Sequence, residues 1–515
     1  MSCGGILNDG SIYGVCSPCD GRIVVSCGRT GSSPVFYHRG PGGFVFGDSL
    51  EELTSFPGFD RNDLRMDAVL DFLAVQYIPG EKSIYNHTFK LLPGYTLTFD
   101  IAARTLQLEE TAPFRSGTRS VPDYNRACDL LRSTLTDAVK QRMDAGTGVF
   151  LSGGLDSAIL CSIAAGMTSA PLPVYSAVFE DAAYNEGDAA KETAAWIRRQ
   201  TGNPLPEKTV TVTPACIERL TDVLAGTGEP FADSSVLPLA AVCGLAAADG
   251  MTSALTGDGA DELFYGYERY RVLRLCRIAS LIPGKRLISS LLSQGAGERS
   301  FAGRLRRFLN TAVLSGDASR YFSIISHNFQ DHSALLNGAG PLADAVTSFG
   351  SSLPASGTDD PAVAAGSFDL KYYLPGDAAV KAKTASILSG LELKTPVLDD
   401  AVADLALSLP AEYKLCGSRR KKIFGDAFAP QLPPDLVTRR KRGFGVPVSQ
   451  WLRKPWLEQL RSALLDSRLM AEWFDRGVME RMISEHETGR NDHAYLLFSL
   501  LMLSLWLTGH GKTGS

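Results

Sequence analysis

Hydrophobic and polar positions follow two different periods along the chain. Up to about residue 112, short apolar runs such as GRIVVSCGR, SPVFYHRG and GFVFGDS stand between Gly-rich turns, a pattern typical of β-strands. From residue 124 onward, amphipathic stretches of helical period alternate with short apolar runs. DYNRACDLLRSTLTDAVKQRM predicts a helix, residues 148–151 a buried strand, and residues 158–165 the helix that follows. The pattern therefore predicts a β-rich segment followed by an α/β segment.

The α/β segment continues with the apolar runs PVYSAVF, KTVTVT and TSALTG, and DAAKETAAWIRRQ predicts a helix between the first two. This alternation favours a doubly wound parallel sheet, in which ligands bind beyond the carboxyl ends of the strands. The C-terminal part is mostly helical. Its apolar run at residues 494–507 is shorter than the about 20 residues that span a bilayer, so we expect a buried helix. A polar linker at residues 111–123 divides the chain into predicted units 1–112 and 124–508.

Composition narrows the class of protein. The chain has 515 residues, 44% of them hydrophobic and 21% charged, with a net charge of −5, which is typical of a globular protein and gives no basic field for nucleic acid. With no visible secretory signal or membrane span, we expect a cytoplasmic protein. Cys16 and Cys19 have a spacing that suits zinc, but a second such pair is missing, and free thiols in β-turns are the alternative.

The stretch VFLSGGLDSAIL lies where the first predicted strand turns into a helix, and helix N-termini attract anions. Gly153 and Gly154 allow the backbone to approach a ligand, while Ser152 and Ser157 offer hydroxyl groups. Asp156 would repel phosphate unless a cation lies between them, which points to Mg²⁺ with a nucleotide phosphate. A Gly-rich turn capped by serine is the structural alternative.

A second acidic stretch, LTGDGADELFYGYERY, follows the fourth predicted strand and contains Asp258, Asp261 and Glu262. If that strand neighbours the first, Asp261 and Asp156 would hold one or two Mg²⁺ ions, because hard cations bound to phosphate need few carboxylate ligands. The alternative is an acidic helix N-terminus, where Asp and Glu are favoured in any case.

Five motifs occur in one order: SGGLDS, EPFADSSVLP, LTGDGADELFYGY, LPAEYKL and RRKRGFGVP. Together they resemble the synthetase half of asparagine synthetases over residues 65–508. That superfamily also includes β-lactam synthetase, carbapenam synthetase and lasso-peptide cyclases. The resemblance implies a doubly wound ATP-pyrophosphatase domain after a small N-terminal-nucleophile-like β domain. It also implies an ATP-dependent carbon–nitrogen ligase, which adenylates a carboxylate with ATP and Mg²⁺, releases pyrophosphate and lets an amine form the amide.

The resemblance also assigns roles to residues of this chain. Lys441, in RRKRGFGVP, matches the catalytic lysine that steadies pyrophosphate and the oxyanion, and Glu392 matches a glutamate that accepts a proton from the amine. Asp156 and Asp261 match the metal ligands. The structural alternatives are a surface charge run for Lys441 and a solvated strand residue for Glu392. The implied nucleotide site, with its last two residues against adenine, comprises Ser152, Gly153, Gly154, Asp156, Ser157, Gly257, Asp258, Val178 and Phe179.

Several departures from the family pattern bear on function. The chain begins Met-Ser-Cys-Gly, which puts Cys3 one residue inside the position of an N-terminal nucleophile, and other glutaminase motifs are missing. We therefore expect residues 1–112 to be a truncated, degenerate glutaminase domain. The usual VKVDRAS reads VKAKTAS, with Lys383 and Thr384 in place of Asp-Arg, which argues against aspartate as substrate. Asp258, by contrast, keeps the acidic residue of asparagine synthetases, where β-lactam synthetase has tyrosine.

The favoured hypothesis is an amide ligase that uses an amine on the substrate, as a lasso-peptide macrolactam cyclase or a lactam synthetase does. Its substrate would be a small-molecule or peptide carboxylate, and a precursor peptide and its protease are the partners that a cyclase implies. The alternative is an asparagine synthetase-like enzyme that amidates aspartate or another carboxylate with ammonia or glutamine. The motif residues Asp156, Asp261, Glu392 and Lys441 argue against a binding protein without turnover.

Overall fold

The structure is a computed structural model. It describes residues 21–31, 34–40, 43–113, 123–284, 301–326, 333–342, 344–345, 360–437, 439 and 445–510, together with the backbone of residues 12–17. The side chains of residues 301–304 are outside this description.

A parallel sheet forms the centre of the α/β part, as the alternating pattern predicts. Its strands are β8 (Thr147–Phe150), β9 (Val174–Phe179), β10 (Glu207–Val212), β11 (Ser253–Leu255) and β12 (Glu392–Lys394), in the spatial order β10-β9-β8-β11-β12. The chain leaves β8 toward β9 on one side, and β11 pairs with β8 on the other. The crevice beyond the carboxyl ends of β8 and β11 is therefore the topological switch point, where such sheets bind ligands.

Helices cover both faces of this sheet. On one face, α3 (Tyr124–Arg142), α4 (Leu155–Met167) and α5 (Gly187–Thr201) share an apolar core with the strands. On the other face, α7 (Val236–Ala248) and α14 (Ala379–Ser389) pack against β8, β9 and β11. All four residues of β8 are buried, with no alternation between an inner and an outer face, which fits the continuous run predicted at residues 148–151.

The N-terminal segment contains two antiparallel sheets, as its short apolar runs predict. One has the order β1-β2-β6-β7 and the other β4-β3-β5. Side chains from both sheets, including Val25, Tyr37, Leu97 and Phe99, form a small core. The strands are β1 (Ile12–Ser17), β2 (Arg22–Cys27), β3 (Val35–Gly40), β4 (Gly43–Gly47), β5 (Thr88–Leu91), β6 (Tyr95–Asp100) and β7 (Thr105–Glu110).

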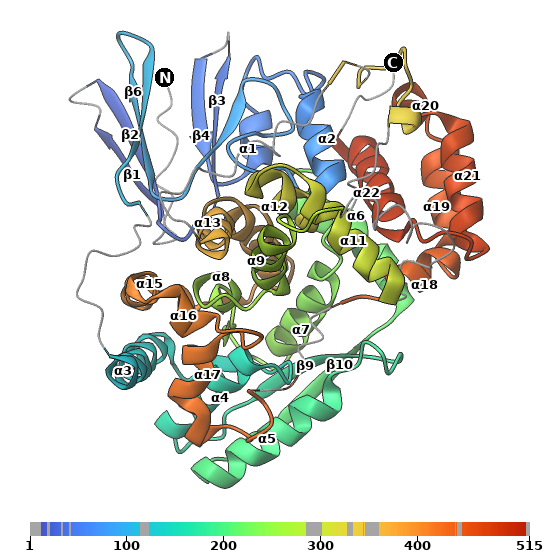
Figure 1. Ribbon diagram of the computed structural model, residues 1–515. Helices are drawn as coiled ribbons and strands as arrows, with labels where there is room; N and C mark the ends of the chain where they lie inside the picture. Colours follow the sequence, from blue (N-terminus) through green and yellow to red (C-terminus); the bar gives the residue numbers. More distant parts are fainter. Residues whose placement is uncertain are drawn as a thin grey trace.

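The segment between these strands packs elsewhere. Helix α2 (Met66–Val75) lies against the C-terminal helix α22 (Ala494–His510), as Figure 1 shows, and the ring of Tyr85 lies 5.9 Å from that of Trp506. The predicted boundary near residue 112 therefore separates two sheet systems, but the packing of residues 66–85 crosses it.

Helix α22 is apolar on all sides because it is buried, as expected from its sequence. None of the helices in the described ranges is long and apolar enough to cross a membrane. The remaining helices used below or visible in Figure 1 are α1 (Leu50–Thr54), α6 (Leu220–Thr227), α8 (Ala260–Leu263), α9 (Glu268–Ala279), α11 (Phe301–Val313), α12 (Asp317–Ile325), α13 (Pro361–Phe368), the π-helix η4 (Asp369–Ala378), α15 (Asp400–Ser408), α16 (Ala411–Lys414), α17 (Lys422–Phe428), α18 (Val448–Arg453), α19 (Leu457–Leu465), α20 (Arg468–Trp473) and α21 (Arg476–Glu487).

Cys3, Cys19 and Lys441 lie outside the described residues, and only the backbone of Cys16 is described. The zinc alternative and the roles assigned to Cys3 and Lys441 therefore stay predictions.

Candidate active site

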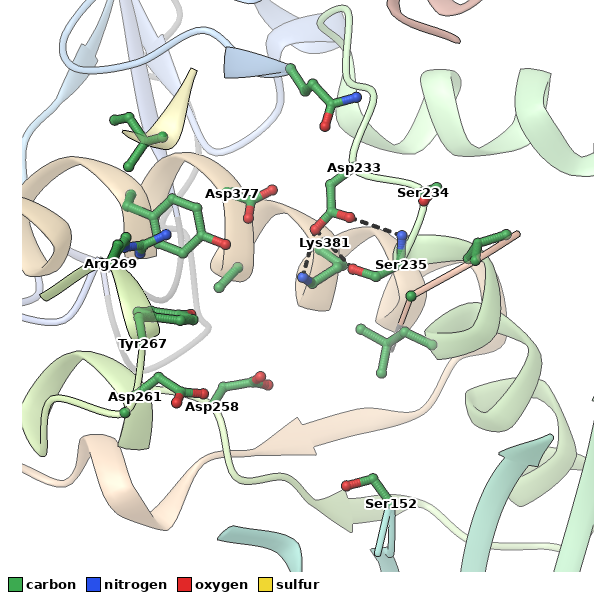
Figure 2. A pocket seen from close by; sticks show the side chains of 18 of the residues that line it. Ser152, Asp233, Ser234, Ser235, Asp258, Asp261, Tyr267, Arg269, Asp377 and Lys381 are labelled. Atoms are coloured by element: carbon green, nitrogen blue, oxygen red, sulfur yellow. Dashed lines mark hydrogen bonds and ion pairs between the residues drawn. The ribbon is translucent and has the colours of Figure 1, made fainter. Parts of the chain in front are cut away.

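A cavity of about 790 Å³ opens at the carboxyl ends of β8 and β11. Figure 2 shows two groups of polar side chains across it. Ser152, Asp258 and Asp261 lie toward the sheet, and Asp233, Asp377 and Lys381 face them from the other side. The cavity is therefore bounded by two polar regions of different chemistry, which are described in turn.

The SGGLDS turn has the strand-turn-helix geometry that the sequence predicts. Ser157 Oγ accepts a hydrogen bond from Ser152 N (3.1 Å) and donates one to Gly154 O (3.2 Å), which closes the turn on itself. Gly153 has φ = +74°, and a Cβ there would lie 2.8 Å from Ala189 Cβ, so a side chain has neither the conformation nor the space. Ser152, Asp156 and Ser157 line the cavity at the start of α4.

The structure brings Asp156 and Asp261 together, as the two motifs predict if β8 and β11 are neighbours. A lysine that the sequence interpretation missed lies between them. Lys421 Nζ is 2.6 and 2.7 Å from the two carboxylate oxygens of Asp156 and 2.8 Å from Asp261 Oδ1. The ammonium group is almost fully buried and separates two carboxylates that would otherwise repel each other.

Two glycines of the second motif make this approach possible. A Cβ on Gly257 would lie 2.7 Å from Asp156 Cβ, and one on Gly266 would lie 1.9 Å from Lys421 Cε and 2.0 Å from Asp261 Oδ1. Gly257, predicted as a nucleotide contact, lines the cavity and also lets its loop approach the SGGLDS turn. Gly266, in FYGY, leaves the space that the side chain of Lys421 occupies.

The donor set at this point fits Mg²⁺ bound to phosphate. Asp156 and Asp261 converge closely enough for one ammonium group to contact both, and the cavity leaves the opposite side open to ligand oxygens. Within the described ranges no cluster of three or more His, Cys, Asp or Glu side chains could hold a metal by itself. A metal here would thus depend on phosphate oxygens for the rest of its coordination.

Asp258 and Glu262 lie on the same side of the cavity. Thr256 Oγ1 donates a hydrogen bond to Asp258 Oδ2 (2.8 Å), which orients this carboxylate. Burial, with the nearby negative charges of Asp261 and Asp369, raises the pKa of Glu262 to about 7, and the hydroxyl of Tyr267 donates to it (2.9 Å).

The opposite side of the cavity was not predicted. Asp233 Oδ2 is 2.8 Å from Lys381 Nζ, and its carboxylate accepts hydrogen bonds from Ser235 N (2.9 Å) and Ser235 Oγ (2.8 Å). Burial alone would raise the pKa of Asp233, but Lys381 and Ser235 lower it to about 2. Asp377, one turn before Lys381, is a contrasting carboxyl group. Burial and the charge of Asp233 raise the pKa of Asp377 to about 7, and its Oδ1 has no hydrogen-bond partner among the described residues.

A buried network holds η4, the element that carries Asp377. Asp369, fully buried at the start of η4, accepts hydrogen bonds from Arg269 Nε (3.0 Å), Tyr270 Oη (2.5 Å) and Tyr321 Oη. The Arg269 guanidinium also lies over the ring of Tyr267, 3.8 Å from its centroid. These contacts fix η4 against α9 and α12 beside the cavity.

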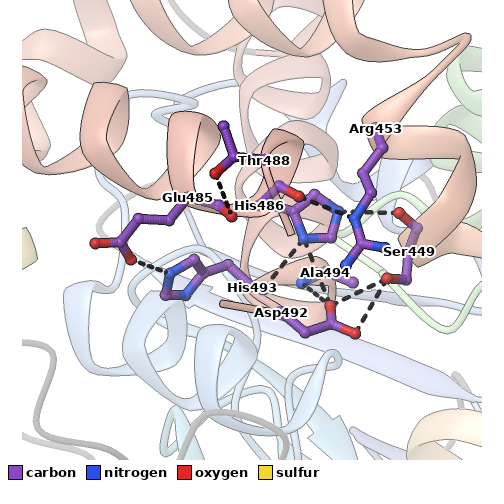
Figure 3. A network of polar contacts seen from close by, with 8 residues as sticks. All are labelled: Ser449, Arg453, Glu485, His486, Thr488, Asp492, His493 and Ala494. Atoms are coloured by element: carbon purple, nitrogen blue, oxygen red, sulfur yellow. Dashed lines mark hydrogen bonds and ion pairs between the residues drawn. The ribbon is translucent and has the colours of Figure 1, made fainter. Parts of the chain in front are cut away.

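The C-terminal helices form a further wall. Ser449 and Asp492 both line the cavity, and Ser449 Oγ donates to the Asp492 carboxylate at 3.1 Å. Figure 3 shows how buried His486 supports them: its Nε2 is 3.0 Å from Ser449 O, and its Nδ1 accepts from His493 N (3.3 Å). Burial lowers the pKa of His486, and these two bonds suit the neutral ring with the proton on Nε2.

Glu392 does not lie with the other predicted site residues. Glu392 starts β12 and pairs in register with Ser253, so it is at the amino end of a parallel sheet whose cavity lies at the carboxyl end. Its side chain is exposed and does not line the cavity, which matches the alternative of a solvated strand residue. Lys383 and Thr384 also lie outside the cavity lining, and Lys383 Nζ instead contacts Asp48 O (2.9 Å) in the N-terminal segment. The change from Asp-Arg therefore bears on the contact between segments and not on this pocket.

Of the two residues predicted to lie against adenine, one lies near the SGGLDS turn. Phe179 is buried at the end of β9 and lines a small recess with Ser152 and Tyr184, whereas Val178 is not part of that lining. On the far side, Gly445 and Val446, which follow the stretch containing Lys441, line the main cavity.

Comparisons with known proteins agree with this geometry. The family model for asparagine synthase matches residues 130–508. An asparagine synthetase [glutamine-hydrolyzing] 1 from Bacillus subtilis is 25% identical over 484 residues, covering 87% of this chain and 69% of that protein. A putative asparagine synthetase [glutamine-hydrolyzing] from Mycobacterium tuberculosis is 27% identical over 490 residues, covering 92% and 72%. A putative asparagine synthetase [glutamine-hydrolyzing] 2 from Methanocaldococcus jannaschii is 30% identical over 258 residues, covering 48% and 47%.

The parallel sheet, the turn at its switch point and these relatives define an ATP-dependent ligase that forms carbon–nitrogen bonds and produces AMP. The chain belongs to the asparagine synthase family.

Proposed function

We propose that this enzyme converts a substrate carboxylate into an acyl adenylate and joins it to an amine on the same substrate or on a partner, as lactam synthetases and lasso-peptide cyclases do. The observation that carries the proposal is the cavity between two polar regions. One is suited to a nucleotide triphosphate at Ser152–Ser157, and the other is an acidic region at Asp233 and Asp377.

In the first step, a substrate carboxylate oxygen attacks the α-phosphorus of ATP, and the bond to pyrophosphate breaks. The amide groups at the start of α4 and the hydroxyls of Ser152 and Ser157 would bind pyrophosphate. Asp156 and Asp261 would hold Mg²⁺, which when bound neutralises charge on the phosphates. Lys421 is placed to contribute charge at the same point, and Lys441 is proposed to act on pyrophosphate as well. Gly154, Gly257, Asp258, Val178 and Phe179 complete the proposed nucleotide site.

In the second step, the amine nitrogen attacks the carbonyl carbon of the adenylate, AMP leaves, and a proton passes to a base. Asp377 suits this role better than Glu392, because it lines the cavity and has an oxygen without a partner among described groups. A carboxyl group with a pKa of about 7 is a more effective base near neutral pH than an ordinary, more acidic one.

The rest of the lining favours an organic amine over free ammonia. Beyond the acidic region, the cavity continues to apolar side chains of α12, α18 and α22, namely Ile324, Ile325, Val448 and Phe498. Such a wall binds hydrocarbon and offers nothing to ammonia. The second candidate is amidation of aspartate or another carboxylate with ammonia or glutamine. It is favoured by Asp258, which carries the acidic residue of asparagine synthetases.

The test is pyrophosphate release with ATP, Mg²⁺ and a panel of amino-acid, β-amino-acid and peptide carboxylates, with and without glutamine or ammonium chloride. We expect release without either nitrogen source and a product lighter than the substrate by one water. Release only with glutamine or ammonium, and an amidated product, would support the second candidate. Asp156→Ala should abolish release. The matched variant Asp144→Ala, at the amino end of the sheet where Asp144 pairs with Lys394, should retain it.

A further inference from the structure

The N-terminal segment contributes two polar side chains to the far side of the cavity. Val75, Gln76 and Tyr77 follow α2 and line the cavity beside the acidic region. Gln76 has φ = 72°, a left-handed conformation that non-glycine residues adopt rarely and at a free-energy cost. A β-rich segment predicted to be catalytically degenerate thus presents side chains to the catalytic cavity of the other segment.

Each of these side chains is held beside one acidic residue. The backbone carbonyl of Gln76 accepts a hydrogen bond from Ala232 N (2.8 Å), which places Gln76 next to Asp233. The ring of Tyr77 packs against η4, since a Cβ on Gly376 would lie 2.7 Å from Tyr77 Cε2, and Gly376 immediately precedes Asp377. The charge of Asp377 contributes, after burial, to raising the pKa of Tyr77.

The polar atoms at this point lack partners in the described part of the molecule. Tyr77 Oη and Asp377 Oδ1 are both buried without a hydrogen bond there. Gln76, which lines the cavity beside them, is 7% exposed. Unpartnered buried polar atoms are rare because each costs free energy, so their convergence on one cavity indicates a ligand that satisfies them.

The charges at this point select the ligand. Lys381 neutralises Asp233, and Arg269 neutralises Asp369. Asp377 interacts with Tyr373 and Asp233, but its Oδ1 has no partner among the described residues and is the carboxylate oxygen left for a ligand. Gln76 Oε1, Tyr77 Oη and Asp377 Oδ1 can all accept hydrogen bonds, and a primary ammonium group has three N–H donors. A carboxylate ligand would meet a like charge there.

We propose that Gln76 and Tyr77 bind the primary amine of the substrate beside Asp377, so that the N-terminal segment selects the nucleophile of the ligase. This inference rests on the proposed function, because it names the amine that attacks the adenylate. The amine binds as the ammonium ion and gives one proton to Asp377, which frees its lone pair to attack the carbonyl carbon of the adenylate. The second proton, lost as the amide forms, passes to the phosphate of the departing AMP, while Gln76 and Tyr77 hold the N–H groups.

The test is binding of n-propylammonium chloride to the full chain in the presence of Mg²⁺ and a non-hydrolysable ATP analogue, measured by ligand-observed NMR. Tetramethylammonium, which has the charge but no N–H donor, is the control ligand. We expect the wild type to bind propylammonium and not tetramethylammonium. Gln76→Ala and Tyr77→Phe should each weaken binding about tenfold to a hundredfold, the usual effect of losing a hydrogen bond to a charged group. Gln107→Ala, which changes an exposed glutamine of β7, should bind as the wild type does.

Gln76→Gly distinguishes the loss of the side-chain amide from backbone strain, because glycine adopts φ = 72° without strain. We expect this variant to bind as weakly as Gln76→Ala. Normal binding by Gln76→Gly, equal binding by all variants, or equal affinity for the two ammonium ions would each overturn the inference.

Pyrophosphate release keeps this inference distinct from the proposed function. If the wild type binds propylammonium through Gln76 and Tyr77 but releases no pyrophosphate with any carboxylate, the proposed function fails and the amine site stands. If release proceeds while propylammonium binding is unchanged in the variants, only the amine site fails.

Discussion

At the scale of single residues, Lys421 is a central part of the site that no local sequence pattern predicts. Removing an ammonium group from water is costly unless opposite charges surround it, and Asp156 and Asp261 supply two. Its backbone has φ = 48°, and Gly266 must lack a side chain to let it pass. A residue kept in such a conformation between two predicted metal ligands is a strong candidate for contact with the phosphates of ATP.

We predict that Lys421→Met lowers pyrophosphate release by about a hundredfold to a thousandfold, the usual effect of losing one preorganised charge at a developing oxyanion. The matched control is Lys422→Met. The neighbouring lysine lies over the ring of Tyr124, 3.4 Å from its centroid, and pairs with Asp426 (3.7 Å), whereas Lys421 pairs with Asp156 and Asp261. Release in the two variants is compared at saturating ATP and Mg²⁺. An equal loss in both would assign the effect to local folding of α17 and not to the charge.

Asp377 makes a second prediction at this scale, the pH dependence of amide formation. Only the ionised carboxylate accepts a proton, and burial, with the charge of Asp233, raises its pKa to about 7. The rate of amide formation should therefore rise with pH through about pH 7. Asp377→Asn should lower the rate by about a hundredfold or more and remove this step from the profile. An unchanged profile in the variant would exclude Asp377 as the base.

The same shift predicts an effect on stability. The pKa of Asp377 is higher in the folded protein than in the unfolded chain. Its ionisation therefore lowers the free energy of unfolding progressively as the pH rises from the ordinary pKa to the raised one. Asp377→Asn removes this loss. The melting temperature of the variant relative to the wild type should therefore be more favourable at about pH 8 than at about pH 5.5, whatever its activity.

At the scale of elements, the features that the sequence predicts correctly are those encoded by neighbouring residues. The SGGLDS turn, the acidic stretch after β11 and the alternating helices and strands are each written within a few consecutive residues, and the structure has them as predicted. Asp233, Asp377 and Lys421 belong to three distant stretches of sequence. Tertiary packing alone brings Asp233 and Asp377 to the cavity and Lys421 to the carboxylates of Asp156 and Asp261. Glu392 lies away from the cavity for a related reason. An apolar run predicts a strand, but the register of that strand decides whether a residue lies at the end that faces the ligand.

The two ends of the π-helix η4 have different roles, which leads to a prediction about this element. Asp369 at its start anchors it to α9 and α12, and Asp377 near its end faces the cavity. Asp369→Ala would leave the buried charge of Arg269 without its partner, at a cost of about 3–5 kcal/mol. We expect a clear fall in melting temperature together with loss of amide formation, because η4 no longer holds Asp377 in place.

The control for η4 is the double variant Arg269→Met with Asp369→Leu, which removes both charges. Replacing a buried ion pair by apolar side chains is often close to neutral. Recovery of the melting temperature in the double variant would confirm the uncompensated charge as the cause, whereas a further fall would show that the packing of η4 is itself at fault.

At the scale of the whole molecule, the N-terminal segment and the α/β part share a hydrophobic core and also both line the cavity. Helix α2 and Tyr85 pack among the C-terminal helices, while Glu229 of the α/β part accepts a hydrogen bond from Ile84 N (2.8 Å) and pairs with Lys90 (3.0 Å). Residues 66–85 therefore serve the folding of the ligase part, even if the β-sheets around them no longer carry a reaction of their own.

This shared packing predicts different outcomes for two buried phenylalanines of the N-terminal segment. Phe72 of α2 lies in the core shared with α22, whereas Phe99 of β6 lies in the separate core between the two antiparallel sheets. Replacing either by alanine removes a large buried side chain and destabilises the core that contains it by about 3–5 kcal/mol.

Phe72→Ala should speed amide hydrogen exchange in α22 and reduce pyrophosphate release. Phe99→Ala should speed exchange in β2, β3 and β6, leave α22 protected and keep pyrophosphate release near that of the wild type. Hydrogen exchange read by mass spectrometry distinguishes these outcomes. Equal loosening of α22 in both variants would mean that the N-terminal sheets and the C-terminal helices unfold as one unit, and protection of α22 in both would mean that α2 is not part of the ligase core.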